Sequence, residues 1–131
     1  LENPAPERGQ FSSLQIAAAA VLADLRWAGA VVVPVDRPMF APTTLAALAA
    51  ALAAAQEAAV LKPAHAGCHG HPVLYGRAFL AVIAAAPADA TAREVARPWA
   101  ARTLAVAVAD PGVLINVDTP EDYRRIAAHR P

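Results

Sequence analysis

The stretch AVVVPVD, residues 30–36, decides the fold class of this chain. Its run of β-branched residues has the length of a buried strand, and Pro34 indicates that the strand is nearly over where Asp36 follows. A helix capped at Thr43 or Thr44 is expected next, reaching about residue 58, because leucines recur there at helical spacing. A strand followed by a loop and a helix is typical of an α/β layered domain with a mostly parallel sheet.

The flanking sequence continues this alternation of strands and helices. Before the stretch, a helix is expected from a cap at Ser12 or Ser13 to about Trp27. After it, the sequence predicts a strand at AAVLKP (58–63), a helix near 77–85 after PVLYG (72–76), and a short helix over DATAREVARPW (89–99). TLAVAVAD (103–110) and VLINVD (113–118) are expected to form a hairpin-like pair around the turn DPG. Thr119 as cap and Pro120 at the first helical position then predict a final helix.

Composition excludes several classes of protein. The 131 residues suit one domain with a real core. Eleven basic and eleven acidic residues give a formal net charge of zero, which lacks the basic footprint of proteins that bind nucleic acid or anionic lipid. The alanine-rich stretch 45–60 is interrupted by Gln56 and Glu57 and is too short for a membrane span. The single cysteine excludes an internal disulfide, and we expect a cytoplasmic protein without nucleic-acid or membrane partners.

Polar side chains end two of the expected strands. Asp36 follows the first, and Asn116 and Asp118 end VLINVD. Ligands collect at the carboxyl ends of strands in open α/β sheets, so these groups could converge on one Mg²⁺ that also takes phosphate oxygens. The alternative is structural: Asp36 opens a turn before Pro38, and Asp118 precedes a helix cap. Both interpretations stay open at this point.

A second candidate site is the loop KPAHAGCHGHPVL, residues 62–74, which holds His65, Cys68, His69 and His71 within seven positions. Structural zinc sites usually take their ligands from two separated pairs, whereas here all four lie in one short loop. A metal site is therefore less favoured than a solvated loop with scattered histidines. A third interpretation fits better, in which a tight Gly-His-Pro turn (70–72) presents one histidine and its backbone to a ligand.

Several short motifs occur together in a known order. They are NP (3–4), GQFSSLQIA (9–17), PVDRP (34–38), GHPVL (70–74), TAREV (91–95) and INVDTPEDY (115–123). With these motifs the chain resembles the MobA-like NTP transferases, the nucleotidyltransferases that include the molybdenum cofactor cytidylyltransferases and guanylyltransferases. The match spans nearly the whole chain. It implies a Rossmann-like three-layer α/β nucleotidyltransferase domain with a mostly parallel sheet.

The resemblance also implies roles for individual residues. Asp36 matches the aspartate that binds Mg²⁺ and the nucleotide phosphates, and Asn116 or Asp118 matches the second metal position, so that Asp36 and Asp118 are the expected catalytic residues. Ser13 lies in the stretch that contacts the nucleotide. The second substrate is expected to meet Gly70, His71, Pro72 and Arg93. The implied reaction transfers an NMP from CTP or GTP to a phosphorylated acceptor such as molybdopterin.

One family segment is absent from the first thirty residues. It is the glycine-rich Leu-Ala-Ala-Gly-x-Ser-x-Arg-Met-Gly stretch, whose amides cradle the triphosphate. Residue 1 is leucine and the single methionine is Met39, so we expect residues 1–131 to be a single partial domain, the C-terminal two-thirds. Its partner would be the missing N-terminal segment or a second copy, and apolar surface and strand edges should be exposed. Two alternatives stay open: a non-catalytic ligand- or partner-binding remnant of the fold, and a histidine-cysteine metal-binding module.

Overall fold

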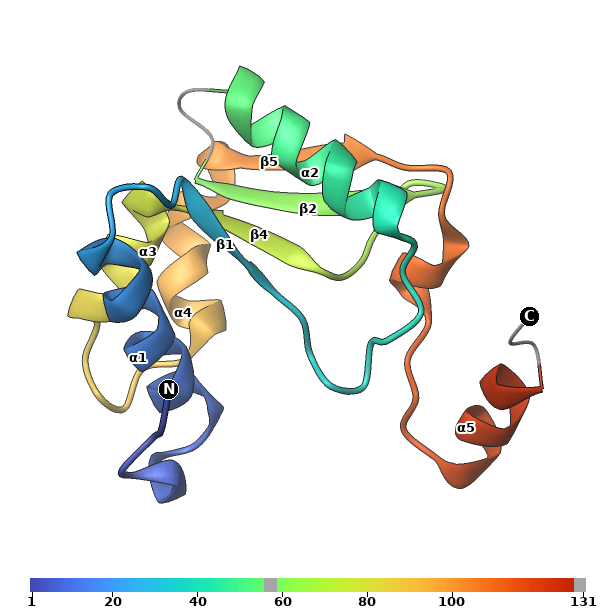
Figure 1. The fold of residues 1–131 in the computed structure, drawn as a ribbon, viewed down its shortest axis with the longest axis horizontal. Coiled ribbons are helices and arrows are strands. Elements are labelled where there is room, and N and C mark those ends of the chain that lie inside the picture. Colours follow the sequence, from blue (N-terminus) through green and yellow to red (C-terminus); the bar gives the residue numbers. More distant parts are fainter. Residues whose placement is uncertain (56–58, 129–131) are drawn as a thin grey trace.

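The computed structural model describes residues 1–55 and 59–128. Helices and strands alternate along much of the chain, so the expected α/β class is confirmed (Figure 1). The elements are η1 (Pro6–Arg8), α1 (Gln10–Ala23), β1 (Gly29–Val32), α2 (Pro42–Ala54), β2 (Val60–His65), β3 (Cys68–His69), β4 (Val73–Gly76), α3 (Arg77–Ala85), α4 (Ala92–Ala96), η2 (Arg97–Arg102), β5 (Thr103–Ala107), η3 (Pro111–Leu114) and α5 (Pro120–Ala127).

The sheet is more mixed than the sequence predicted. Its strand order is β1-β4-β2-β3. The fifth strand, β5, lies off this path and pairs with β2. Among the described strands, only β2 and β5 pair in parallel, and the pairs β1–β4, β4–β2 and β2–β3 are antiparallel. The short 66–72 connection returns the chain beside β2, which forces antiparallel pairing, whereas the helical crossover through α3 and α4 lets β5 run parallel to β2.

The sheet has helices on both faces, as expected for three layers. Successive residues of a strand point to opposite faces. Val60 of β2 therefore packs with Phe79 of α3 and with residues of α1, while the neighbouring Leu61 packs with Leu48 of α2. The larger core thus lies between the sheet and the α1–α3 pair, and the smaller one lies under α2.

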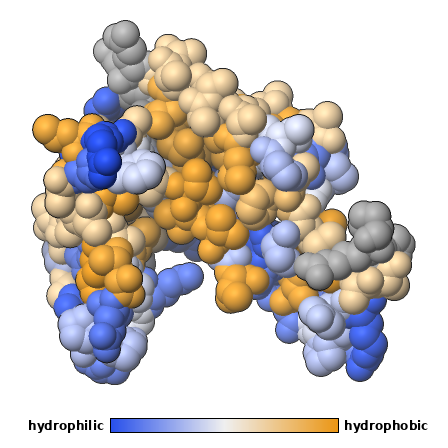
Figure 2. All heavy atoms as spheres, viewed as in Figure 1, coloured by the Kyte–Doolittle hydropathy of each residue, from blue (hydrophilic) through white to orange (hydrophobic). Residues whose placement is uncertain are grey.

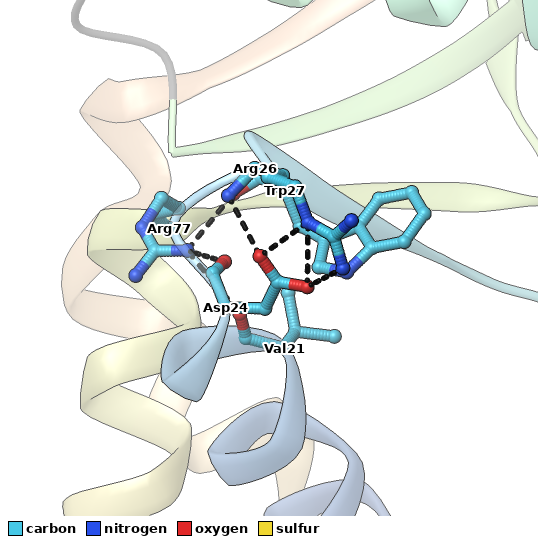
Figure 3. A network of polar contacts seen from close by, with 5 residues as sticks. All are labelled: Val21, Asp24, Arg26, Trp27 and Arg77. Carbon is cyan, nitrogen blue, oxygen red and sulfur yellow. Dashed lines mark hydrogen bonds and ion pairs between the residues drawn. The ribbon is translucent and has the colours of Figure 1, made fainter.

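Arg77, the first residue of α3, joins this helix to the end of α1 (Figure 3). Its guanidinium donates hydrogen bonds to four backbone carbonyl oxygens in the last turn of α1 and in the turn that follows, where helix carbonyls lack the usual partners along the chain. The distances are 3.2 Å to Val21, 2.8 Å to Leu22, 3.0 Å to Asp24 and 2.9 Å to Trp27. A cation at the negative end of a helix is also favoured by the helix dipole. The pair α1–α3 is therefore held by polar contacts as well as by its core.

The expected strand at 113–118 is wrong, and with it the hairpin-like pair. Residues 113 and 114 belong to η3, and residues 115–118 form neither helix nor strand. The cause is Asp110, whose carboxylate accepts hydrogen bonds from the backbone N–H groups of Ala41 (2.6 Å) and Gly112 (2.9 Å) and from the Thr44 hydroxyl (2.6 Å). These contacts draw the chain after β5 toward the start of α2, away from β5.

Helix boundaries follow the predicted pattern in part. The helix expected near 77–85 is α3, and Thr119 caps α5 in a capping box with Asp122, as predicted. In contrast, α2 begins after Ala41 because the buried Thr44 side chain bonds Asp110, and it ends at Ala54; residues 56–58 of the expected helix lie outside the described residues. Gly9 precedes α1 in place of the expected serine cap, and α1 ends at Ala23, short of Trp27.

Apolar surface is exposed near β1, as expected from the sequence. β1 ends the strand order, so one of its edges is unpaired among the described strands. Val31, Val33 and Val35 along this segment are 42%, 46% and 98% exposed. Figure 2 shows apolar residues gathered over the middle of the molecule, between the part that holds α1 and α4 and the part that holds α5. None of the helices that the structure describes combines the length and the apolar run needed to cross a bilayer.

Candidate functional site

Two predicted site loops meet at η3. A Cβ atom on Gly112 would lie 2.1 Å from the Met39 carbonyl oxygen, and one on Gly70 would lie 2.2 Å from that of Val113. Only glycine allows backbones to approach so closely. The His71 N–H donates to the Val113 carbonyl at 2.9 Å. The Asp36 loop and the Gly-His-Pro turn are therefore both packed directly on η3.

The segment after η3 returns to Asp36. The Val117 N–H donates to the Asp36 carbonyl oxygen at 2.9 Å, which brings Asn116 and Asp118 next to the loop that carries the first predicted metal ligand. The Asn116 amide donates to a carboxylate oxygen of Asp118, and its own carbonyl oxygen is buried without a hydrogen-bond partner among the described residues. Carboxylate and amide oxygens are ligands that hard divalent cations prefer, so these residues fit such a cation.

The histidine-cysteine loop does not gather into a metal site. Within residues 1–55 and 59–128, no three His, Cys, Asp or Glu side chains lie close enough to hold a metal ion. His65 Nδ1 lies 3.1 Å from the Val108 carbonyl oxygen, and Cys68 and His69 are exposed. The metal-binding module is therefore contradicted for this loop, whereas the Gly-His-Pro turn is tightly held by its contacts with η3.

A cavity of about 750 Å³ opens beside the Gly-His-Pro turn, between the sheet and the α4–η2 segment. We call it the cationic cavity, because Lys62, His69, His71, Arg93 and Arg97 line it and, among the described residues, no acidic side chain does. The remaining lining residues are Val60, Gly70, Val73, Tyr75, Ala92, Ala96, Ala100 and Thr103. Its chemistry suits a molecule that carries negative charge and has an apolar part.

His71 lies near the charged groups of Asp36 and Arg37 in one loop and of Lys62 on β2. Burial is the main cause that lowers the pKa of its imidazole, and the cations Arg37 and Lys62 lower the pKa further, while Asp36 acts in the opposite direction. The His71 Nδ1 atom is buried without a hydrogen-bond partner among the described residues. A neutral imidazole is therefore favoured at neutral pH, with one ring nitrogen left for a ligand.

A second cavity of about 470 Å³ adjoins the cationic cavity, since His71, Tyr75 and Ala92 line both. Its other walls are the start of α1, the end of β1 and the 88–91 loop. Ser13 is exposed outside this lining, and its hydroxyl accepts a hydrogen bond from the Asn3 amide at 2.9 Å.

The predicted site residues thus fall into separate places. Gly70, His71 and Arg93 line the cationic cavity, while Pro72 is buried. Asp36 lines a different cavity, of about 430 Å³, with Val117 and residues of α5. Ser13 lies apart from the residues at η3. The Gly-His-Pro turn and the Asp36 loop both contact η3, but the predicted substrate residues and the predicted metal residue Asp36 line different cavities. The roles of these residues stay predictions.

Sequence reasoning missed Lys62, Tyr75 and Arg97 in the cationic cavity. One signal for Lys62 was present: it interrupts the apolar run of AAVLKP, where a strand buried on both faces would carry an apolar residue. For Tyr75 and Arg97 the sequence holds no comparable signal.

Comparison with known proteins identifies the family. The model of the MobA-like NTP transferase domain matches residues 1–105, and the chain belongs to this family. No curated protein matches the chain. The crystal structure of Rv0371c from Mycobacterium tuberculosis H37Rv superposes with a TM-score of 0.69 at 26% identity, over 92% of this chain and 60% of that one.

Two further structures agree. A homologue of Rv0371c from Mycobacterium sp. strain JC1 gives a TM-score of 0.67 at 25% identity, over 91% of this chain and 57% of that one. A complex of Rv0371c with manganese gives 0.63 at 28% identity, over 90% and 61%. The chain therefore spans about 60% of the length of these neighbours. Their folds confirm the expected Rossmann-like α/β class.

Proposed function

We propose that this chain serves the divalent-cation-dependent transfer of an NMP group from CTP or GTP to a phosphorylated acceptor such as molybdopterin. The observation that carries this proposal is the meeting of two loops at η3. One holds Asp36 beside Asn116 and Asp118, and the other holds His71 at the mouth of the cationic cavity. Membership of the MobA-like NTP transferase family supports the reaction type.

The proposed chemistry is a substitution at phosphorus. An oxygen of the acceptor phosphate attacks the α-phosphorus of the NTP, forming a new P–O bond. The bond from the α-phosphorus to the oxygen bridging to the β-phosphate breaks, and pyrophosphate leaves with that electron pair. Such a transfer depends mainly on positioning and on stabilising the phosphate charge. The chain's own contribution is to hold the two substrates on either side of η3.

Asp36, Asp118 and the amide oxygen of Asn116 would hold the cation. When bound, Mg²⁺ or Mn²⁺ supplies charge neutralisation for the phosphates. The unpartnered carbonyl oxygen of Asn116 supports this assignment, because a buried polar atom without a partner is costly unless a ligand satisfies it. The manganese complex of Rv0371c, a structural neighbour, supports a divalent cation in general.

The test is a titration of the chain with Mn²⁺, read by the paramagnetic broadening of NMR signals, with and without CTP or GTP. Broadening should centre on residues 36–39 and 116–118 in the wild type and be lost in Asp36→Asn and Asp118→Asn. Glu7→Gln, an exposed carboxylate elsewhere, is the matched control. Pyrophosphate release from each NTP is measured in parallel. Wild-type broadening in Asp36→Asn would contradict the metal assignment.

The second candidate function is a non-catalytic one, favoured by the unpaired edge of β1 and the exposed valines beside it. In this case the chain binds a ligand or partner without turning over an NTP. Nucleotide and acceptor binding without pyrophosphate release would favour this alternative. A cytoplasmic location belongs to the proposal in either form, supported by the free, exposed Cys68.

A further inference from the structure

Lys62 is the least expected residue of the sheet. It lies on β2, which pairs with β3, β4 and β5, and it shares a face with Val60, a residue of the larger core. The side chain is half-buried, and no carboxylate among the described residues forms an ion pair with it. A lysine without a partner at such a position destabilises the fold unless its charge meets solvent or a ligand.

Two arginines reach the same cavity from the opposite wall. Arg93 and Arg97 are four residues apart on the continuous α4–η2 segment, a spacing that places side chains on one side of a helix. Arg97 lies near enough to Glu94 to help lower the pKa of that carboxyl, but the Glu94 carboxylate is held by Thr91, which is the main cause of the shift. Among the described residues no ion pair holds the Arg93 or Arg97 guanidinium, so both can donate to a ligand in the cavity that they line.

The floor between these walls is apolar and aromatic. Val73 and Tyr75 of β4 lie beside Val60 of β2, and the Tyr75 ring packs against Phe79 with centroids 5.0 Å apart. The cavity thus joins positive charge to a flat, supported ring surface. Asp36 and Asp118 do not line it, so an anion held here is a different group from the phosphate that reacts beside Asp36.

We propose that Lys62, Arg93 and Arg97 form an anion subsite that binds a second anionic group of the acceptor, remote from the reacting phosphate. This inference rests on the proposed function, and it makes Lys62 and Arg97 specificity-determining residues. Arginine supplies paired donors that match an oxyanion, and lysine supplies a point charge. The body of the acceptor then lies on Tyr75 and Val73, with its reacting end directed past His71.

The test measures binding of inorganic phosphate to the 131-residue chain by isothermal titration calorimetry at constant ionic strength. Lys62→Met and Arg97→Gln each remove one charge from the cavity, and Arg124→Gln removes one from α5, outside it. We expect the Kd for phosphate to rise at least tenfold in the first two and to stay unchanged in the third. Arg97→Lys keeps the charge but loses the paired donors, so its Kd for phosphate should lie between those of the wild type and Arg97→Gln. Thermal unfolding of each variant checks that it is folded.

Three results would overturn the inference: no phosphate binding at millimolar concentration, equal Kd values in all variants, or displacement of phosphate by CTP or GTP alone. The last would mean that the cavity holds nucleotide phosphates. Phosphate binding needs no turnover, so the subsite and the transfer reaction fail separately. If phosphate binds but no pyrophosphate is released, the proposed reaction is contradicted and the subsite is not. If pyrophosphate is released but phosphate does not bind, the subsite is contradicted and the reaction is not.

Discussion

Gly70 is the residue on which the geometry of the site depends most directly. Its lack of a side chain lets the Gly-His-Pro turn pack on the backbone of Val113, and its N–H donates to the Pro63 carbonyl at 2.8 Å. Both contacts are with backbone atoms, which cannot move aside as a flexible side chain can. The position of His71 is therefore set by a residue that has no chemistry of its own.

Gly70→Ala should lower the free energy of unfolding by about 2–3 kcal/mol, because the added Cβ collides with the Val113 carbonyl. Gly67→Ala is the matched control. Gly67 has a φ of +80° but nothing within 4 Å of a built Cβ, so its cost should be only about 1 kcal/mol from backbone strain. Urea denaturation followed by circular dichroism measures both. Equal losses in the two variants would show that the contact with Val113 is unimportant.

At the scale of single elements, the ends of helices were predictable only where their signals are local. Thr119 and Pro120 mark the start of α5 because the capping box lies within one turn. Thr44 carries the same local signal, yet its hydroxyl bonds Asp110, a residue far away in the sequence. The strand expected at 113–118 was wrong for the same reason. Contacts between distant residues override local preference.

The candidate site divides in the same way. Asp36 and the Gly-His-Pro turn could be named as candidates because each belongs to a short motif, and their roles stay predictions. Lys62 and Arg97 could not be brought together from the sequence, since their meeting depends on how the α4–η2 segment packs against the sheet that contains β2. A short motif can be recognised in the sequence because its residues are adjacent. A cavity is lined by residues of separate elements, so its composition becomes known only from the fold.

Arg77→Met should lower the free energy of unfolding by about 2–3 kcal/mol, because four carbonyl oxygens in the last turn of α1 and the turn after it lose a charged donor. Methionine keeps most of the apolar stem. Hydrogen exchange should also accelerate in the last turn of α1. Arg26→Met is the control, since the Arg26 side chain is 85% exposed and surface ion pairs contribute little. If both variants unfold alike, Arg77 does not hold α1 to α3.

On the scale of the whole molecule, stability is concentrated in the sheet and its two cores. The residues that are almost fully buried come largely from β2, β4 and α3, whereas α5 has none. In Figure 1, α5 stands apart from the sheet at the end of an extended segment. The molecule thus combines a packed centre with a helix, α5, whose Tyr123 and Ile126 line one cavity together with Asp36 and Met39.

Native-state hydrogen exchange should separate these two parts. We expect amides of β2 and β4 to exchange only through global unfolding, and amides of α5 to exchange through local opening at much lower free energy, because few apolar contacts oppose it. Mass spectrometry of peptides from the labelled chain measures this difference. Protection of α5 equal to that of β2 would mean that α5 unfolds together with the core.

The attachment of η3 to both site loops has a consequence for how the chain tolerates change in length. The backbone from Val113 to Val117 is fixed at one end by the His71 N–H and at the other by the Asp36 carbonyl. It is therefore a spacer whose length sets the separation between the two candidate site loops. Substitution of the exposed Ile115 should leave this separation unchanged. One inserted or deleted residue would instead misalign the two halves of the candidate site in a protein that still folds.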